Sequence, residues 1–340
     1  MTSDKKIKVL VVDDSIIFRE VLARGISADP RIEVIATAED PFEARDKIIK
    51  YRPDVMTCDI EMPRMNGIEF LRRLLPQYSL PAIVVSTIST AVFDALNAGA
   101  VDFVTKPDIK NDNGLYVFIS EIIKKIKIAA LSKVRCQEEN TIAAIAHNTV
   151  SNTSSKIIAI GASTGGTEAI FSVIRSLPKN IPGIVVVQHI PPVFSKMYAD
   201  RLNATTNFEV KEARTGDIVE KGHVLIAPGD KHMRIKKLGS GYMVECFSGE
   251  KVNGHCPSVD ILFNSVAKEA GSNAVGVILT GMGYDGAKGL LSMRRKSART
   301  IGQDEKSSVV YGMPKVAYEI GAVEKQATLN NIPVLISKML

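Results

Sequence analysis

The stretch IKVLVVDDSIIFREVLARGIS, residues 7–27, decides the fold of the first part of the chain. A run of β-branched and aliphatic residues leads into Asp13 and Asp14, and then into a helical spacing of apolar side chains. A short continuous apolar run is typical of a strand buried in a parallel sheet, where the next helix covers one face. The stretch therefore predicts a β/α unit.

The same alternation recurs as far as Lys127. It predicts five strands with helices between them, among which 16–27 and 41–51 are the clearest. The predicted strands are residues 8–12, 33–36, 55–58, 82–86 and 102–105. Five β/α repeats in about 120 residues predict a doubly wound (β/α)5 parallel sheet.

A second α/β pattern begins at Lys156. Its long apolar runs, 157–160, 183–187 and 274–279, predict buried parallel strands. Shorter strands are expected at 224–227, 233–237 and 242–247, with a hairpin turn at 237–241. We therefore expect a second, mainly parallel α/β domain with an antiparallel hairpin.

The segment between the two patterns is polar and lacks a sustained period, apart from a possible helical turn at 141–146. We interpret it as a linker. The predicted domains are thus residues 1–128 and 156–340, with 129–155 between them.

Bulk composition narrows the class of protein. The 340 residues carry 43 Lys and Arg against 37 Asp and Glu, and the net charge of +6 is spread along the chain. Nucleic-acid binding needs a focused basic patch, so we expect none. No apolar run approaches a membrane span, and the polar N-terminus does not resemble a signal peptide. Four cysteines without a C-x-x-C pair fit a reducing compartment, so we expect a cytoplasmic protein without membrane insertion.

Several charged side chains follow strands of the first predicted sheet. Asp13 and Asp14 follow the first strand, Asp59 the third and Lys106 the fifth, while Ser86 ends the fourth. The carboxyl ends of parallel strands meet at one edge, where α/β sheets build their sites. Three carboxylates at close range favour a hard cation such as Mg²⁺, and an ammonium and a hydroxyl suit phosphoryl oxygens.

The strings VVDDS (11–15), DIEMPRMNG (59–67), VVST (84–87) and DFVTKP (102–107) resemble the response-regulator receiver family from about Ile7 to Lys127. The resemblance implies that Asp59 accepts phosphate from a histidine kinase. It further implies that Asp13, Asp14 and Asp59 hold Mg²⁺, with a ligand from the Glu61 carbonyl, and that Lys106 pairs with the phosphoryl group. Ser86 and Phe103 stand at the family's switch positions. The stretch from Ser86 to Ala98 is a few residues shorter than in relatives, which affects the output face.

The second half contains a candidate nucleophile. The predicted strand 157–160 leads into GASTGG (161–166) and then into a helical pattern, which places Ser163 on a strand-to-helix turn of G-x-S-x-G type. A serine needs a base. His189 follows the next long strand and is preferred; His232 is the second choice and His255 in GHCPSVD the third. His147 lies in the linker, and His223 begins a strand at the opposite edge.

The base needs an orienting carboxylate. Asp285, in the glycine-rich loop TGMGYDG (280–286) after a buried strand, is the first candidate, although it also fits the cap of a helix at 287–293. Asp260 is the alternative, and it looks more like the cap of a helix at 261–270.

The strings IGASTGG (160–166), VVVQHIPPVF (185–194), IAPGDKHM (226–233), PSVDILF (257–263), VILTGMGYDGAKG (277–289) and VVYGMP (309–314) resemble the catalytic domain of chemotaxis protein-glutamate methylesterases. The resemblance assigns Ser163, His189 and Asp285 as the triad and the Met282 N–H as an oxyanion donor. Cys256 stands where relatives commonly carry a basic residue, and Ser297 where they often have glycine.

The implied function is hydrolysis of glutamate methyl esters, and in some members deamidation of glutamines, on the cytoplasmic helices of chemoreceptors. A chemotaxis histidine kinase is the implied partner, and the esterase needs no cofactor. The rival interpretation is a response regulator whose second domain only binds a nucleotide or a partner. Gly161, Gly165 and Gly166 after a strand fit a dinucleotide cradle, but that site needs an acidic residue where Gln188 and His189 stand.

Overall fold

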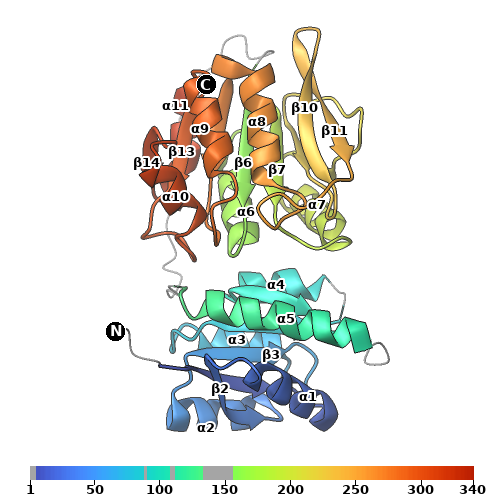
Figure 1. Ribbon diagram of the computed structural model, residues 1–340, viewed down its shortest axis with the longest axis vertical. Helices are drawn as coiled ribbons and strands as arrows, with labels where there is room; N and C mark the ends of the chain where they lie inside the picture. Colours follow the sequence, from blue (N-terminus) through green and yellow to red (C-terminus); the bar gives the residue numbers. More distant parts are fainter. Residues whose placement is uncertain (1–4, 88–89, 108–111, 133–155) are drawn as a thin grey trace. The chain divides into compact units, whose positions relative to one another are not determined.

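The computed structural model describes residues 5–87, 90–107, 112–132 and 156–340 (Figure 1). Contacts divide the chain into two units, residues 1–140 and 141–340, and each is described by itself. Both are α/β, as the sequence predicts. Among the described residues, no helix combines the length and apolar character that a membrane span requires.

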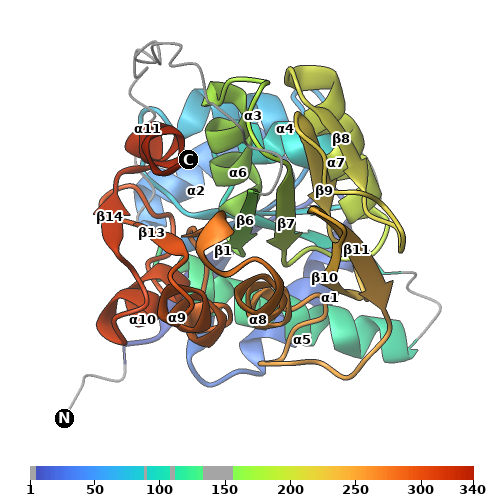
Figure 2. The same ribbon diagram turned by 90° about the horizontal axis from the view of Figure 1, so that it is seen from above.

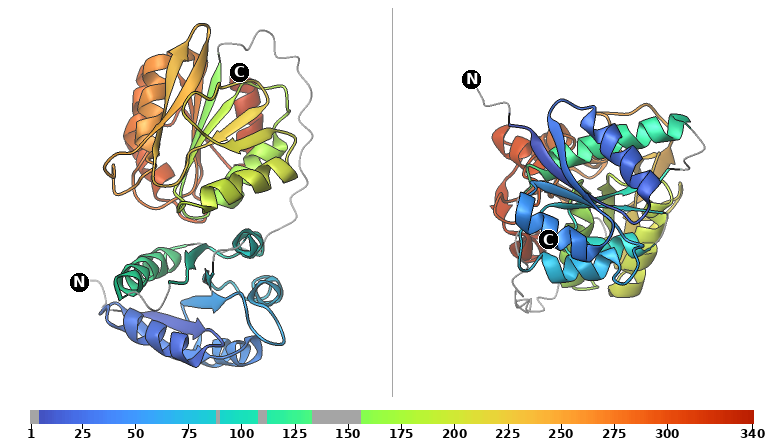
Figure 3. Two further views of the ribbon diagram at one scale, coloured as in Figure 1. Left: turned by 90° about the vertical axis from the view of Figure 1, so that its right-hand side faces the viewer. Right: turned by 90° about the horizontal axis from the view of Figure 1, so that it is seen from below.

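The first unit is a five-stranded parallel sheet in the order β2-β1-β3-β4-β5. Helices α1 and α5 lie together on one face, and α2, α3 and α4 on the other (Figure 3). Its strands are β1 (Ile7–Val12), β2 (Ile32–Ala38), β3 (Val55–Asp59), β4 (Ala82–Ser86) and β5 (Asp102–Thr105), and its helices are α1 (Ile16–Ser27), α2 (Pro41–Tyr51), α3 (Gly67–Leu74), α4 (Ala91–Asn97) and α5 (Asp112–Ala129). All five predicted strands are confirmed, and the two predicted helices have the expected bounds.

The order of this sheet fixes where a site forms. From β1 the chain adds β2 on one side and then returns to add β3, β4 and β5 on the other side. This switch between β1 and β3 is where α/β sheets form a crevice at the carboxyl ends of their strands. Local chemistry supports the framework: the Asp40 side chain accepts hydrogen bonds from Phe42 N and Glu43 N, so it caps α2.

The second unit contains a seven-stranded parallel sheet in the order β14-β13-β12-β6-β7-β9-β8. Helices α6, α7 and α11 cover one face, and α8, α9 and α10 the other (Figure 2). Its strands are β6 (Ile157–Ala162), β7 (Ile184–Gln188), β8 (Glu209–Glu212), β9 (His223–Ile226), β12 (Ala274–Ile278), β13 (Arg299–Gln303) and β14 (Lys325–Ala327), and its helices are α6 (Gly166–Ser176), α7 (Phe194–Thr205), α8 (Val259–Glu269), α9 (Ala287–Arg295), α10 (Met313–Glu319) and α11 (Ile332–Met339), with short 3-10 turns η1 (Gly271–Asn273) and η2 (Leu329–Asn331).

The predicted hairpin is also present. Strands β10 (His232–Leu238) and β11 (Gly241–Phe247) pair antiparallel across a turn at Gly239 and Ser240, and β10 packs on α8. The buried core of this unit runs from β6 and β7 to the inner faces of α8 and α9. The nucleophile strand β6 therefore lies in the middle of the sheet, between β12 and β7.

The structure describes only part of the predicted linker and of the stretch after Ser86. Helix α5 includes Ala129, the first residue of the predicted linker. The remainder from 133, with the helical turn expected at 141–146 and His147, lies outside the described residues, as does part of the stretch after Ser86.

Candidate active site and phosphoacceptor site

Ser163 lies on a tight turn between β6 and α6. Its N–H donates to Thr280 O at 3.0 Å, and its carbonyl accepts from Gly166 N at 2.7 Å. Gly165 has a φ of 75°, which favours glycine, and a Cβ at Gly166 would lie 2.1 Å from Gln188 Oε1. The glycines of the motif thus make the turn possible, and the predicted strand-turn-helix context is confirmed.

His189 lies beside this turn because of the register of two strands. Ala162 of β6 pairs with Gln188 of β7, and His189 N donates to Ala162 O at 3.2 Å. The Gln188 side-chain amide donates to the carbonyls of both Ser163 and His189, at 2.9 and 3.1 Å. The residues that follow the two paired strands are thereby held together.

The imidazole of His189 is oriented by Asp285. His189 Nε2 lies 2.9 Å from Asp285 Oδ2, and both side chains are buried. The other ring nitrogen, Nδ1, is buried and has no hydrogen-bond partner among the described residues. If Nε2 donates its proton to the carboxylate, Nδ1 is the nitrogen left to accept one.

The Asp285 carboxylate collects further donors. Oδ1 accepts from Asn253 Nδ2 and Ser258 Oγ, both at 2.8 Å, and from Asp260 N at 3.3 Å, while Oδ2 also accepts from Val259 N at 2.7 Å. Burial opposes the charge, but the hydrogen bonds from His189, Asn253 and Ser258 hold the pKa of Asp285 below its usual range. Asp285 is therefore a fixed anion facing His189.

Both expected helix caps are wrong. Gly286, not Asp285, precedes α9 at the cap position, and Asp285 instead receives the first N–H groups of α8. Asp260 lies inside the first turn of α8, since that helix begins at Val259 after Ser258. Its carboxylate accepts from Gly289 N at 2.6 Å and from Asn253 Nδ2 at 2.8 Å. It therefore ties α8 to α9, and no contact between it and His189 is found among the described residues.

The other described histidines have different surroundings from His189. His232 is buried with both ring nitrogens engaged: Nδ1 accepts from Ser258 N at 3.2 Å, and Nε2 contacts Glu250 O at 2.8 Å. His223 begins β9 between Glu209 and Glu220. His255 stacks on His189, with ring centroids 3.6 Å apart. The geometry thus favours His189 as the base.

The loop after β12 closes the site. A Cβ on Gly281 would lie 2.7 Å from Ser163 Cβ, so the backbone of this loop runs directly against the nucleophile. Met282 follows Gly281 and is partly exposed. Its N–H therefore belongs to a loop that runs against Ser163.

Sequence reasoning missed Asn253 and Ser258. Asn253 bridges the carboxylates of Asp260 and Asp285, and it lies in a tight turn between Val252 and His255. The signal was present: Asn-Gly between two residues that pair is a strong mark of a two-residue hairpin turn. Neither Cys256 nor Ser297 takes part in the hydrogen bonds described above; burial raises the pKa of the Cys256 thiol, and Ser297 has a φ of 65°.

In the first unit the predicted acidic cluster is confirmed. Oxygens of Asp13, Asp14 and Asp59 lie within 4.8 Å of one another. Lys106 Nζ donates to Asp59 Oδ2 at 2.6 Å, and it lies 2.9 Å from Asp13 Oδ2 as an ion pair without hydrogen-bond alignment. Burial raises the pKa of Asp59, and the contact with Lys106 offsets only part of the increase. Three carboxylate donors at this spacing fit a hard divalent cation.

The two predicted switch residues, Ser86 and Phe103, lie on the neighbouring strands β4 and β5. Ser86 ends β4, and its buried hydroxyl has no hydrogen-bond partner among the described residues. Phe103 is buried in β5, with Lys125 Nζ 5.1 Å from its ring centre. Glu61 N donates to Asp59 Oδ1 at 3.4 Å; its carbonyl as a metal ligand stays a prediction.

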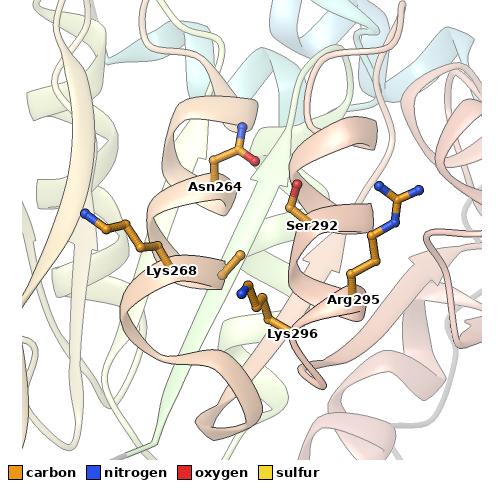
Figure 4. A pocket seen from close by; sticks show the side chains of 6 residues that line it. Asn264, Lys268, Ser292, Arg295 and Lys296 are labelled. Atoms are coloured by element: carbon orange, nitrogen blue, oxygen red, sulfur yellow. The ribbon is translucent and has the colours of Figure 1, made fainter.

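A separate cavity of about 300 Å³ lies between α8 and α9 (Figure 4). Its lining includes Lys268, Arg295 and Lys296, near the C-terminal ends of the two helices. Ser163, His189 and Asp285 do not line it. It is therefore distinct from the candidate active site.

Comparison with known proteins identifies the family of each domain. The chain matches the family model of the CheB methylesterase over residues 158–336 and that of the response regulator receiver domain over residues 9–113. A protein-glutamate methylesterase/protein-glutamine glutaminase 2 of Syntrophomonas wolfei is 59% identical over 99% of this chain and 98% of its own length. A protein-glutamate methylesterase/protein-glutamine glutaminase of Salmonella typhimurium is 45% identical over 96% of this chain and 95% of its own.

The crystal structure of the Thermotoga maritima CheB methylesterase catalytic domain is 39% identical, with a TM-score of 0.54, and covers 55% of this chain and 100% of that one. The family match, the full-length relatives and this structural likeness all indicate one family. The chain belongs to the CheB methylesterase family and carries a response-regulator receiver domain before the methylesterase domain.

Proposed function

We propose that this chain is a phosphorylation-controlled serine esterase that hydrolyses glutamate methyl esters on chemoreceptors. Its receiver domain spans residues 1–128, its linker 129–155 and its catalytic domain 156–340. The observation that carries the proposal is the buried His189–Asp285 pair, held beside Ser163 by the pairing of Ala162 with Gln188.

Ser163 acts as the nucleophile. Its Oγ attacks the ester carbonyl carbon, and its proton passes to Nδ1 of His189, the ring nitrogen that has no hydrogen-bond partner in the described part of the chain. The imidazolium that forms is stabilised by Asp285, which is ionised and already hydrogen-bonded to Nε2.

The negative charge on the former carbonyl oxygen needs donors. The Met282 N–H is one, because the Gly281 backbone lies against Ser163. The tetrahedral intermediate then expels methanol, which takes the proton from His189 and leaves an acyl-serine. A water molecule, deprotonated by His189, attacks this second ester and releases the glutamate carboxylate and Ser163. Ammonia replaces methanol as the leaving group if a glutamine is the substrate.

The receiver domain supplies control. Asp59 accepts a phosphoryl group, and Asp13, Asp14 and Asp59 hold Mg²⁺, whose charge neutralises the incoming phosphate. Lys106, which contacts Asp59 Oδ2, pairs with the phosphoryl group. The Ser86 hydroxyl, which has no hydrogen-bond partner within the described residues, donates to one of the phosphoryl oxygens. Phe103 repacks as Ser86 moves.

The partners follow from this chemistry and from the relatives. A chemotaxis histidine kinase supplies the phosphoryl group, and the methylated cytoplasmic helices of chemoreceptors supply the ester, so the protein works in the cytoplasm. A purely binding output domain does not account for the oriented His189–Asp285 pair. Gln188, where a dinucleotide site needs an acid, instead ties the Ser163 turn to His189.

The test is methanol release from methyl-labelled receptor membranes. We expect the wild-type protein to release label, and Ser163→Ala, which removes only the nucleophilic oxygen, to release none while unfolding at the same temperature. His232→Ala is the matched histidine control, and its loss of activity should be smaller than that of His189→Ala. Near-wild-type release by Ser163→Ala would end the serine mechanism.

A further inference from the structure

A tight turn from Val252 to His255 lies over the candidate triad. The N–H of each of these two residues donates to the carbonyl of the other, both at 3.0 Å. The central residues, Asn253 and Gly254, have φ values of 53° and 84°, and positive φ at both is what a type I′ turn requires. The Asn-Gly dipeptide therefore fixes where the flanking side chains point.

This turn touches two members of the triad. Asn253 donates to Asp285 Oδ1 at 2.8 Å. The ring of His255 lies face to face on the ring of His189, with centroids 3.6 Å apart and an angle of 8° between the planes. One short turn thus contacts both the base and its orienting carboxylate.

His255 remains uncharged at neutral pH. Its partial burial, and then the nearby His189 and Lys251, lower its pKa to about 4, while Asp285 acts in the opposite direction. Stacking against a neutral ring avoids repulsion when His189 receives a proton, because a cation over an uncharged aromatic face is favourable.

The His189 ring needs this second restraint. Its hydrogen bond to Asp285 fixes the position of Nε2 but leaves the ring able to pivot about that contact. Proton transfer requires Nδ1 to face the Ser163 hydroxyl, and an error of about 1 Å in such an arrangement can cost about a hundredfold in rate. The flat ring of His255, stacked on one face of the His189 ring, restricts this rotation.

We propose that His255 is a positioning residue for the esterase: its ring holds the imidazole plane of His189 so that Nδ1 faces Ser163 while Nε2 stays on Asp285. The inference rests on the proposed function, since it needs His189 to act as the base. It assigns the function of His255 to its flat ring rather than to hydrogen bonding or proton transfer.

Three substitutions separate these functions in the full-length protein. His255→Phe keeps a flat ring and removes both nitrogens, His255→Gln keeps hydrogen-bonding groups and removes the ring, and His255→Ala removes both. His223→Ala, at the start of β9, is the matched control. Thermal unfolding of each variant shows whether the fold is intact, and the rate of methanol release is measured over a range of receptor concentrations.

We expect His255→Ala and His255→Gln to lower kcat by about 10- to 100-fold with little change in KM, and His255→Phe to stay within about threefold of wild type. If His255→Ala fails to fold, the comparison of Phe with Gln decides. An alanine variant as fast as wild type, a phenylalanine variant as slow as the glutamine variant, or a loss confined to KM would overturn the inference. Absence of methanol release from the wild-type protein would instead contradict the proposed function.

Discussion

Replacing Asp285 with asparagine should separate its two tasks, orienting His189 and stabilising the start of α8. The change keeps the shape of the side chain but exchanges one acceptor oxygen for an NH₂ group. The wild-type carboxylate accepts five hydrogen bonds, two at Oδ2 and three at Oδ1. The asparagine can satisfy only one of these sets.

With the NH₂ group in the Oδ2 position, the three bonds at Oδ1 survive and only Val259 N, at 2.7 Å, loses its acceptor. His189 can then accept through Nε2, which forces its proton onto Nδ1. With the amide reversed, Asn253 and Asp260 N lose their acceptor. The first arrangement retains more bonds, so we expect it to dominate and to leave His189 in the wrong tautomer for catalysis.

The expected loss in kcat is about 10⁴-fold, which is the effect of the corresponding tautomer error in other serine hydrolases. One buried N–H without an acceptor costs about 1–3 kcal/mol, and the lost charge at the α8 N-terminus adds about 0.3–1 kcal/mol. For a domain of this size, a total of about 1–4 kcal/mol lowers Tm by roughly 3–16 °C.

Methanol release and calorimetric unfolding measure the two effects. Asp260→Asn is the matched control, because Asp260 also accepts from buried donors of the same loop and helix ends but makes no hydrogen bond to His189 among the described residues. It should lose stability with a far smaller loss in kcat. A folded Asp285→Asn variant within tenfold of the wild-type kcat would refute the assignment of Asp285 as the orienting acid.

Four further outcomes are expected. Asp59→Asn should block Mg²⁺-dependent labelling by a small phosphodonor, and undiminished labelling would place the phosphate elsewhere. A fragment from residue 154 should hydrolyse receptor esters faster than the unphosphorylated full chain, because we expect the tethered receiver, present at high effective concentration, to restrain the esterase; equal rates would reject autoinhibition. Ser297→Gly should raise the free energy of unfolding of the catalytic domain by about 0.5–1 kcal/mol in chemical denaturation. Ser297 has a φ of 65°, where an L-residue costs about 1–2 kcal/mol, and the greater entropy of glycine in the unfolded chain offsets part of the gain. An unchanged free energy of unfolding would show that the strain is relieved locally. The pKa of His255 is lowered from 6.5 to about 4 on folding, so between pH 6.5 and 4 the unfolded chain binds more protons than the folded one. The free energy of unfolding should therefore fall as pH falls from 6.5 to 4. A His255→Phe variant with the same pH dependence would contradict this.

The convergence of Ser163, His189 and Asp285 could be predicted because each follows a strongly apolar strand, and parallel strands place such residues at one edge. Strands β4 and β5 and helices α1 and α2 were predicted to the residue, because their apolar runs and helical spacing are clear. The strands β8, β13 and β14 were not predicted. Strands β8 and β14 are short edge strands of mostly polar residues. Strand β13 has one buried aliphatic side chain, Ile301, and buries Thr300 and Gln303 through hydrogen bonds.

The start of α8 shows why local signals failed. Its first N–H groups are satisfied by Asp285, a residue 26 positions away from Val259, so no nearby acid marks the cap. Asp260 resembled a cap only because its true partners, Gly289 N and Asn253, are distant or belong to an unrecognised turn. Long-range hydrogen bonds of this kind follow from the folded topology and cannot be deduced from a window of sequence.

The central place of β6 in its sheet has a consequence for synthesis. The turn that bears Ser163 is bounded on one side by the loop after β12, and the Thr280 hydroxyl donates to Thr164 O across 116 positions of the chain. The ribosome finishes synthesis of the first unit, which includes Asp59, long before it has made β12. Domains generally fold as units in the order of their synthesis. If Asp59 accepts phosphate as proposed, the nascent chain carries its phosphoacceptor before its esterase site is complete, because the Ser163 turn is held by the loop after β12.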